Sequence, residues 1–377
     1  MEFDWTEDQQ AFRKELATTL EAFVEPGFDF WDLSEKEAAQ RSLGTCPRLA
    51  GQGWLTPAWP KEYGGRAATP WEQLIVAEEM ITHGEPRAGQ YMNVNFIGPM
   101  IMLYGTEAQK AYHLKRISAG SVIWCQGFSE PNAGSDLASL RTRAVLDGDH
   151  YVVNGEKIWT SYADAAEFCL LLVRTDPAAK KQEGISVLLA PVATPGITVW
   201  PVHGIVGDGA FNLVSFTDAR IPVSCRLGPE NQGWTIVRKA LALERVGVAR
   251  FARTAMELDR IAAWARENGR MDETNRRILA RAYTATELAR ALVHKVVDDQ
   301  VHGDRDAPSP YVYRAAVVWA ERATHEAAFQ VMGTQALAGG SLADKQFKWG
   351  IAAGVASGSY EMQLNLIASL ILNMPRN

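Results

Sequence analysis

The middle of the chain contains the run Phe168-Cys-Leu-Leu-Leu-Val173, followed by Ile185-Ser-Val-Leu-Leu189. Both are rich in residues that favour β-strands, and both are too short for a typical helix. Similar short runs surround them, namely Tyr151-Val-Val153, Ile197-Thr-Val-Trp200 and Leu213-Val-Ser-Phe216. Turn signals such as Asp147-Gly-Asp149 and Thr194-Pro-Gly196 separate the runs, without room for intervening helices. This spacing predicts an antiparallel barrel or sandwich over residues 121–228.

The two flanks of this β region have the composition of helices. Fourteen of the 17 prolines fall at or before Pro229, which leaves 230–307 and 311–374 free of proline. Proline-free stretches rich in Ala, Leu, Arg and Glu permit long helices. At the other end, Thr6 and Gln9 have capping-box spacing before a helical apolar pattern. We therefore expect an α+β fold: a helical domain over 1–120, the β domain over 121–228, and a C-terminal helical domain over 229–377.

Composition limits the classes of function. Lys and Arg total 38 against 44 Asp and Glu, so the net charge is 38 − 44 = −6. This balance disfavours nucleic acid, whose phosphates require a basic surface. The charge-free stretch 89–106 contains several Asn and Gln residues, so we expect no membrane span. Four scattered cysteines and an acidic start predict a soluble, cytoplasmic protein. The seven histidines have no metal-ligand spacing, so we expect no metal.

Two polar segments carry the chemistry that the sequence suggests. The first is Phe128-Ser-Glu-Pro-Asn-Ala-Gly-Ser-Asp136, and the second is Asn154-Gly-Glu-Lys-Ile-Trp-Thr-Ser161. Taken alone, the first is a turn whose small residues would let a ligand approach the backbone, but on its own it is better interpreted as a surface loop. The second alone is a hairpin strand. The chain also lacks the glycine-rich nucleotide-binding motifs GxGxxG and GxxxxGK[ST], so any nucleotide cofactor must be held in another way.

In this order and spacing, the two segments resemble the flavin-binding signatures of the acyl-CoA dehydrogenase family. The resemblance extends over the whole chain, and further matching segments are Pro60-Lys-Glu-Tyr-Gly-Gly65, Tyr104-Gly-Thr-Glu-Ala-Gln-Lys110 and Gln330-Val-Met-Gly-Thr334. It implies that the C-terminal domain is a four-helix bundle. It also implies FAD as cofactor, with Trp159 against the flavin ring and Ser161 near its N5 atom. The family usually has threonine where this chain has Ser129 and Ser161, and serine keeps the hydroxyl. The implied cofactor residues are Gln126, Phe128, Ser129, Gly134, Ser135, Trp159, Thr160, Ser161, Arg266, Gln330, Gly333, Thr334, Ser359 and Glu361.

Glu244 is the candidate catalytic base. On a helical period its neighbours are all apolar: Val237, Ala240, Leu241, Gly247, Val248 and Phe251. Burial raises the pKa of a carboxylate toward that of a base useful at neutral pH. Periodicity alone leaves a buried structural ion pair equally open. The resemblance favours the base, because family members carry the catalytic Glu either here or near the C-terminus. Here Ser357 occupies the second place and cannot act as a base.

The resemblance also implies a reaction and its substrate contacts. Glu244 would remove the α proton of an acyl-CoA thioester while the β hydride passes to flavin N5, which gives a trans-2-enoyl-CoA. The backbone N–H of Ser357 would stabilise the developing charge on the thioester carbonyl. The implied substrate-binding residues are Ser135, Arg245, Ser357 and Gly358. An electron-transfer flavoprotein would then accept the electrons. An acyl-CoA oxidase on the same scaffold is an alternative.

One segment departs from the family pattern. Most members carry Arg-x-x-Phe-Gly, whose arginine reaches the FAD pyrophosphate of a neighbouring subunit. The corresponding stretch here is Ala265-Arg-Glu-Asn-Gly-Arg-Met-Asp272, in which Arg266 or Arg270 would have to replace that arginine. This variant segment resembles bacterial members linked to steroid side-chain degradation, which points to a bulky or branched acyl group. Several of these form α2β2 heterotetramers, so the chain is expected to be a homo-oligomer or half of such an assembly. A half-site or non-catalytic partner subunit is therefore a second alternative.

Overall fold

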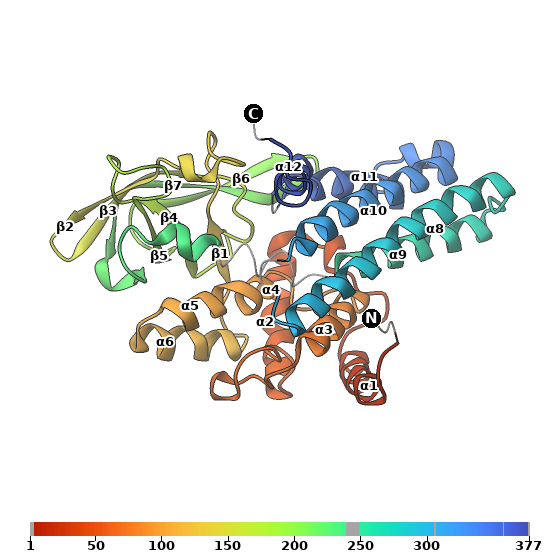
Figure 1. The fold of residues 1–377 in the computed structure, drawn as a ribbon, viewed down its shortest axis with the longest axis horizontal. Helices are drawn as coiled ribbons and strands as arrows, with labels where there is room; N and C mark the ends of the chain where they lie inside the picture. The colour runs from red at the N-terminus through yellow and green to blue at the C-terminus, as the bar shows by residue number, and fades with distance from the viewer. Residues whose placement is uncertain (1–3, 239–248, 305–306, 357, 376–377) are drawn as a thin grey trace. The chain divides into compact units, whose positions relative to one another are not determined.

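The structure is a computed structural model that describes residues 4–238, 249–304, 307–356 and 358–375 (Figure 1). Contacts between residues divide the chain into two units. The sheet unit consists of Leu20–Ala68 and His83–Glu244. The helical unit consists of Met1–Thr19, Thr69–Thr82 and Arg245–Asn377. The expected helical, β and helical order is confirmed, whereas the boundaries at 120 and 228 stay predictions.

The β region forms one eight-stranded sheet within the described residues. Its strands run in the order β6-β7-β3-β2-β4-β5-β8, and β1 pairs with β4. Most neighbours are antiparallel, as expected, while β1 and β2 each pair with β4 in parallel. All five predicted runs lie in strands. The strands are β1 (Trp124–Gly127), β2 (Arg143–Asp147), β3 (His150–Lys157), β4 (Phe168–Arg174), β5 (Ile185–Pro191), β6 (Ile197–Gly204), β7 (Gly207–Pro222) and β8 (Arg226–Leu227).

Strand β7 contains one residue more than the segment of β3 that it faces. Val153 pairs with Ala219, but Gly155 pairs with Phe216, so three steps along β7 match two along β3. Asp218 lies in this β-bulge with a positive φ of 47°, and Asn154 and Asp218 hold it through two side-chain hydrogen bonds of 2.9 and 3.0 Å. The bulge changes which residues face the core: Val214 and Phe216 before it, Ala219 and Ile221 after it.

Short helices complete the sheet unit. They are α2 (Glu35–Gly51), α4 (Gln90–Met92), a π-helix (Asn93–Ile97), α5 (Gly98–Tyr104) and α6 (Glu107–Ser118), with 3-10 turns at Phe30–Asp32, Lys61–Tyr63, Leu137–Ser139 and Val223–Cys225. The charge-free stretch 89–106 supplies α4, the π-helix and α5, and half of its residues are buried. The Trp59 indole N–H donates to the Val94 carbonyl (2.7 Å), which ties the loop before Pro60 to the π-helix.

The helical unit contains long helices that pack side by side (Figure 1). Leu258 and Ile261 of α8, Leu279 of α9 and Val331 of α10 lie in a common core. The Thr6–Gln9 capping box forms as expected, with backbone to side-chain hydrogen bonds of 3.0 and 3.3 Å. The helices are most of α1 (Glu7–Glu21), α3 (Pro70–Thr82), α8 (Arg250–Glu267), α9 (Glu273–Val301), α10 (Ser309–Met332), a 3-10 turn (Gly333–Leu337), α11 (Leu342–Ala353) and α12 (Tyr360–Leu370).

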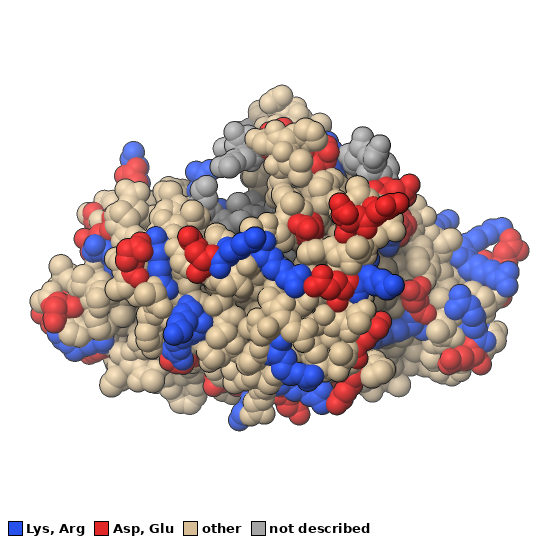
Figure 2. Space-filling model, turned by 90° about the horizontal axis from the view of Figure 1, so that it is seen from below, with Lys and Arg blue, Asp and Glu red and all other residues tan. Residues whose placement is uncertain are grey.

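Acidic and basic side chains alternate over short distances on the face shown in Figure 2. That face therefore presents no continuous basic surface of the kind that nucleic acid requires. Among the helices of the described ranges, none is both long and apolar enough to cross a membrane.

Candidate active site

The first polar segment forms a tight turn directly after β1. Glu130 and Ala133 exchange backbone hydrogen bonds of 3.1 and 3.0 Å, with Pro131 inside the turn. Ile158 N–H donates to the Ser129 carbonyl (2.9 Å), which places this turn against the end of β3. The structure therefore brings the segments 126–135 and 157–161 together, although a hairpin separates them in sequence.

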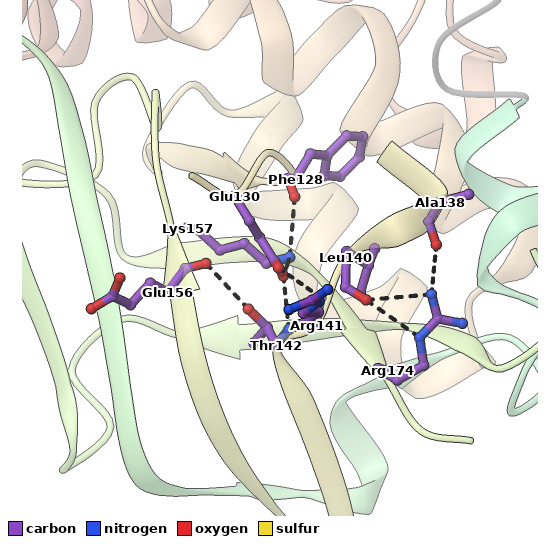
Figure 3. A network of polar contacts seen from close by, with 9 residues as sticks. All are labelled: Phe128, Glu130, Ala138, Leu140, Arg141, Thr142, Glu156, Lys157 and Arg174. Carbon is purple, nitrogen blue, oxygen red and sulfur yellow. Dashed lines mark hydrogen bonds and ion pairs between the residues drawn. The ribbon is translucent and has the colours of Figure 1, made fainter. Parts of the chain in front are cut away.

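A buried ion pair holds the two segments together (Figure 3). The Lys157 side chain is fully buried, and its Nζ donates to Glu130 Oε1 (2.8 Å) and to the Phe128 carbonyl (3.1 Å). Glu130 also accepts the backbone N–H groups of Arg141 (2.6 Å) and Thr142 (2.8 Å). With these donors each carboxylate oxygen is satisfied, which is the condition for a buried ion pair to be tolerated. The pair thus fixes the loop between β1 and β2 on strand β3.

The pKa values of this pair follow from burial and hydrogen bonding. Burial lowers the pKa of Lys157, and the attraction of Glu130 opposes that shift. Burial would raise the pKa of Glu130, but Lys157, Thr142 and Arg141 together hold it below its usual value.

A second buried cationic side chain, Arg174, holds the later part of the loop between β1 and β2. It donates to the Ala138 carbonyl (2.6 Å) and to the Leu140 carbonyl (Figure 3). The backbone of the loop is therefore anchored at both ends by buried cationic side chains.

The residues after Lys157 present an aromatic side chain and two hydroxyls. Trp159 has a positive φ of 62°, its side chain is 55% exposed, and its ring meets Phe211 edge-on at 5.7 Å. Thr160 exchanges backbone hydrogen bonds with Asn212 (3.0 and 3.2 Å). Thr160 Oγ1 is buried and has no hydrogen-bond partner among the described residues. Buried hydroxyls ordinarily have a partner, so this atom is suited to a ligand.

The loop itself leaves space for a ligand. Ser129 is partly exposed, Gly134 and Ser135 are exposed, and a Cβ placed on Gly134 would meet no atom within 4 Å. Gln126 lies at the end of β1 and is partly exposed, whereas Phe128 is buried. An exposed aromatic face, an unpartnered hydroxyl and an open glycine-containing loop fit the flat ring and polar edge of a flavin.

The other predicted cofactor residues lie in the helical unit. Gln330 and Thr334 are exposed near the end of α10, and Gly333 between them has φ 60° and ψ −131°, a conformation suited to glycine. A Cβ on Gly333 would lie 2.6 Å from Nη2 of Arg270, so the guanidinium lies against this glycine. Arg270 Nε also donates to the Val331 carbonyl (3.3 Å). Arg266 lies instead on the exposed last turn of α8, close to Tyr283.

Residues near the start of α12 were also predicted to bind cofactor or substrate. Ser359 caps the helix by accepting the Met362 N–H (3.3 Å), and Glu361 is exposed in the first turn. Gly358 has a φ of 87° and is exposed. Glu244, Arg245 and Ser357 lie outside the described residues. Val237 and Phe251, which a continuous helix would place beside Glu244, are each 1% exposed, but α8 begins only at Arg250, after the non-helical Ala249.

Sequence reasoning included Glu130 and Lys157 in the polar segments but gave them no role. The sequence could have indicated their ion pair, because a lysine between buried strand positions requires a buried anion as its partner. Arg270 was considered only as a substitute for Arg266. Its contact with Gly333 could not be inferred from the sequence, because it joins helix ends that are 63 residues apart.

Three models of acyl-CoA dehydrogenase domains match nearly the whole chain. The N-terminal domain model matches residues 6–121, the middle domain model 125–218, and the C-terminal domain model 231–372. A helical, sheet and helical chain with this anchored loop is the architecture of a class of oxidoreductases. The chain belongs to the acyl-CoA dehydrogenase family, so the enzyme class expected from the sequence is confirmed.

Individual relatives agree with this assignment. Acyl-CoA dehydrogenase FadE26 of Mycobacterium tuberculosis is 33% identical over 410 residues, which cover 100% of this chain and 99% of the relative. The solved structure of the Tcur3481-Tcur3483 steroid acyl-CoA dehydrogenase is 30% identical, with a TM-score of 0.88 and full coverage of both chains. The ChsE4-ChsE5 complex from Mycobacterium tuberculosis is 31% identical, with the same TM-score and full coverage. The expected similarity to steroid-related members is thus confirmed.

Proposed function

We propose that this chain catalyses the FAD-dependent α,β-dehydrogenation of an acyl-CoA thioester to the trans-2-enoyl-CoA. The observation that carries this proposal is the loop 128–136, which the buried Lys157–Glu130 pair fixes beside the exposed ring of Trp159. Family membership supplies the reaction class. Trp159, Thr160, Ser161 and the open loop at Gly134 and Ser135 would bind and orient the flavin. Bound FAD supplies the acceptor for the β hydride.

The chain's own residues would manage the proton and the developing charge. Glu244 would take the α proton, and burial in an apolar setting would raise the proton affinity of its carboxylate. The backbone N–H of Ser357 would hold the thioester carbonyl, and Gly358 and Arg245 would contact the substrate. The names of the steroid-related structures support a bulky or branched acyl group, such as a steroid side chain. An electron-transfer flavoprotein is the proposed electron acceptor.

The first test uses the full-length chain, purified alone and mixed with acyl-CoA thioesters of increasing bulk. The expected result is a visible flavin spectrum that bleaches without oxygen on addition of a thioester. Trp159→Ala is expected to retain less flavin, because the ring loses its packing partner, while the fold remains. A wild-type chain that is colourless and also fails to bind added FAD would contradict the proposed function and favour the non-catalytic partner subunit. Rapid reoxidation of the bleached protein by air would identify an oxidase.

The oligomeric state of the chain can be measured on the same purified samples. Two of the similar structures carry the names of paired chains, the ChsE4-ChsE5 complex and Tcur3481-Tcur3483. We propose that this chain forms either a homo-oligomer or an α2β2 heterotetramer with a sister chain. We further propose that Arg270, lying against Gly333, supplies the pyrophosphate contact that the altered segment at Arg266 would otherwise lack. Light scattering combined with flavin quantitation then separates a homo-oligomer with one FAD per chain from a half-loaded assembly.

Arg270→Gln is expected to weaken FAD retention roughly ten- to hundredfold. This range corresponds to the roughly 1.5–3 kcal/mol carried by a hydrogen bond to a charged group. Equilibrium dialysis of FAD against each variant measures the effect. Arg266→Gln is the matched control, because it removes the same charge four residues away, from an exposed helix turn. An effect of Arg266→Gln larger than that of Arg270→Gln would return the pyrophosphate contact to Arg266.

A further inference from the structure

A carboxyl group from a distant helix reaches the turn that holds Ser161. Glu35 is the first residue of α2, and its Oε2 accepts the backbone N–H of Tyr162 at 2.7 Å. The same carboxyl group also interacts with the side chain of the adjacent Ser161. Both contacts lie within the sheet unit, and 127 residues separate Glu35 from Tyr162 in sequence. Neither the cofactor residues nor the base proposed above includes Glu35.

Packing fixes the position of this carboxyl group. The Tyr162 side chain is buried in a cluster with Ala38 and Ala39 of α2, so the helix and the turn share a core. A Cβ on Gly89 would lie 2.7 Å from the Tyr162 ring, which shows how closely the ring is packed. A complete capping box between Ser34 and Glu37 starts the helix at Glu35. The packing of α2 against this turn therefore holds the Glu35 carboxyl group beside Ser161 and Tyr162.

The surroundings favour the neutral form of Glu35. The side chain is partly buried, and no described lysine or arginine forms an ion pair with it. Burial raises the pKa of Glu35 to about 8, against the hydrogen bonds from Tyr162 and Ser161, and the nearby negative charge of Asp164 adds to the rise. The other titratable groups facing it are the thiol of Cys125 on β1 and the phenol of Tyr162. Beside Tyr162, Glu85 and Arg87 pair with each other at 2.7 Å.

We propose that Glu35 is a positioning residue that decides whether the Ser161 hydroxyl donates its hydrogen toward the flavin or away from it. The inference rests on the proposed function, because it takes Ser161 to lie near N5. A hydroxyl has one hydrogen to donate and two lone pairs. Neutral Glu35 can donate to Ser161 Oγ, which leaves the Ser161 hydrogen free to point at the cofactor. Ionised Glu35 can only accept, so it takes the Ser161 hydrogen and leaves a lone pair toward the cofactor.

The two hydrogen-bond arrangements of Glu35 and Ser161 suit the two redox states of the flavin. Flavin N5 accepts a hydrogen bond in the oxidised cofactor and donates one in the reduced cofactor. Neutral Glu35 therefore suits the oxidised protein and ionised Glu35 suits the reduced protein. Glu35 should consequently bind its proton less tightly in the reduced protein and release it to solvent. Between its two pKa values, Glu35 then offsets part of the proton uptake that accompanies flavin reduction.

The test measures the midpoint potential of the bound flavin against pH in the full-length protein. In the wild type the potential is expected to fall less steeply with pH just below about pH 8 than above it. Glu35→Gln keeps an oxygen for the Tyr162 N–H but cannot titrate, so its potential should fall with one constant slope. Glu37→Gln is the matched control on the same helix, because glutamine also satisfies a capping box, and it should keep the wild-type curve.

Ser161→Ala supplies a second, independent measurement. The variant removes the hydroxyl that transmits the effect, so the change of slope should disappear, and adding Glu35→Gln should alter nothing more. If Glu35→Gln does not fold, Ser161→Ala still tests the proposed role of Glu35. A flavin-containing wild type whose slope is unchanged in Glu35→Gln and in Ser161→Ala would overturn the role of Glu35 alone. A wild type without flavin would instead contradict the proposed function.

Discussion

Replacing Glu244 by glutamine is expected to abolish flavin bleaching by an acyl-CoA thioester while the fold and the bound flavin remain. The amide keeps the size of the side chain but cannot accept the α proton. Removal of a general base costs on the order of 100-fold or more in rate. Anaerobic stopped-flow absorbance of wild type and variant, mixed with the same thioester, measures this loss directly.

Glu361→Gln is the matched control for this prediction. Glu361 is exposed at the start of α12 and lies four residues beyond the alternative position for a catalytic glutamate, which is occupied by Ser357. Flavin that stays bound in this variant should still be bleached by the thioester, because Glu361 is implied as a cofactor contact and not as the base. If Glu361→Gln stops bleaching and Glu244→Gln does not, Glu361 is the base and the helix after Gly233 has another role.

Lys157→Met is expected to destabilise the protein by about 3–5 kcal/mol, because it leaves the buried Glu130 carboxylate without its cation. Glu130 would keep only the backbone N–H groups of Arg141 and Thr142. Urea unfolding followed by tryptophan fluorescence and circular dichroism measures the change. The loop would also lose the bond from Lys157 Nζ to the Phe128 carbonyl, so the variant should retain less flavin.

Two further variants separate burial from charge. Lys181→Met removes the exposed ion pair with Asp136 (2.7 Å) and should cost at most about 1 kcal/mol. The double variant Lys157→Met, Glu130→Leu removes both buried charges and should recover much of the stability lost in Lys157→Met. If the double variant loses as much stability as Lys157→Met and Glu130→Leu lose together as single variants, the ion pair does not explain the instability of Lys157→Met.

The fold could be predicted because its signals are local. Five β-rich runs, the proline-free stretches 230–307 and 311–374, and the Thr6–Gln9 capping box each depend on residues close in sequence. The sheet was expected to be antiparallel, and its parallel pairs at β4 were not foreseen. Pairing direction depends on where a strand enters the sheet after a long connection, and neither period nor composition contains that information.

The site was predictable in part for the same reason. Residues 126–135 and 157–161 form recognisable segments, and the structure places these segments together. The contact of Glu35 with Ser161 and Tyr162 could not be predicted, since a glutamate at the start of a helix has an ordinary local explanation as a favourable charge near the helix N-terminus. The contact of Arg270 with Gly333 likewise depends on tertiary packing between helix ends.

The β-bulge in β7 marks the place where this strand could lose a residue during evolution. Val214 and Phe216 face the core on one side of Asp218, and Ala219 and Ile221 face it on the other. Deleting one residue between Phe216 and Ala219 would leave a two-residue step opposite the two-residue step from Val153 to Gly155, so the strand would become regular and both apolar pairs would still face the core. A one-residue deletion elsewhere in β7 would instead turn part of this apolar set to solvent. Changes of length within β7 should therefore occur at the bulge, whereas the regular parts of the strand keep their length.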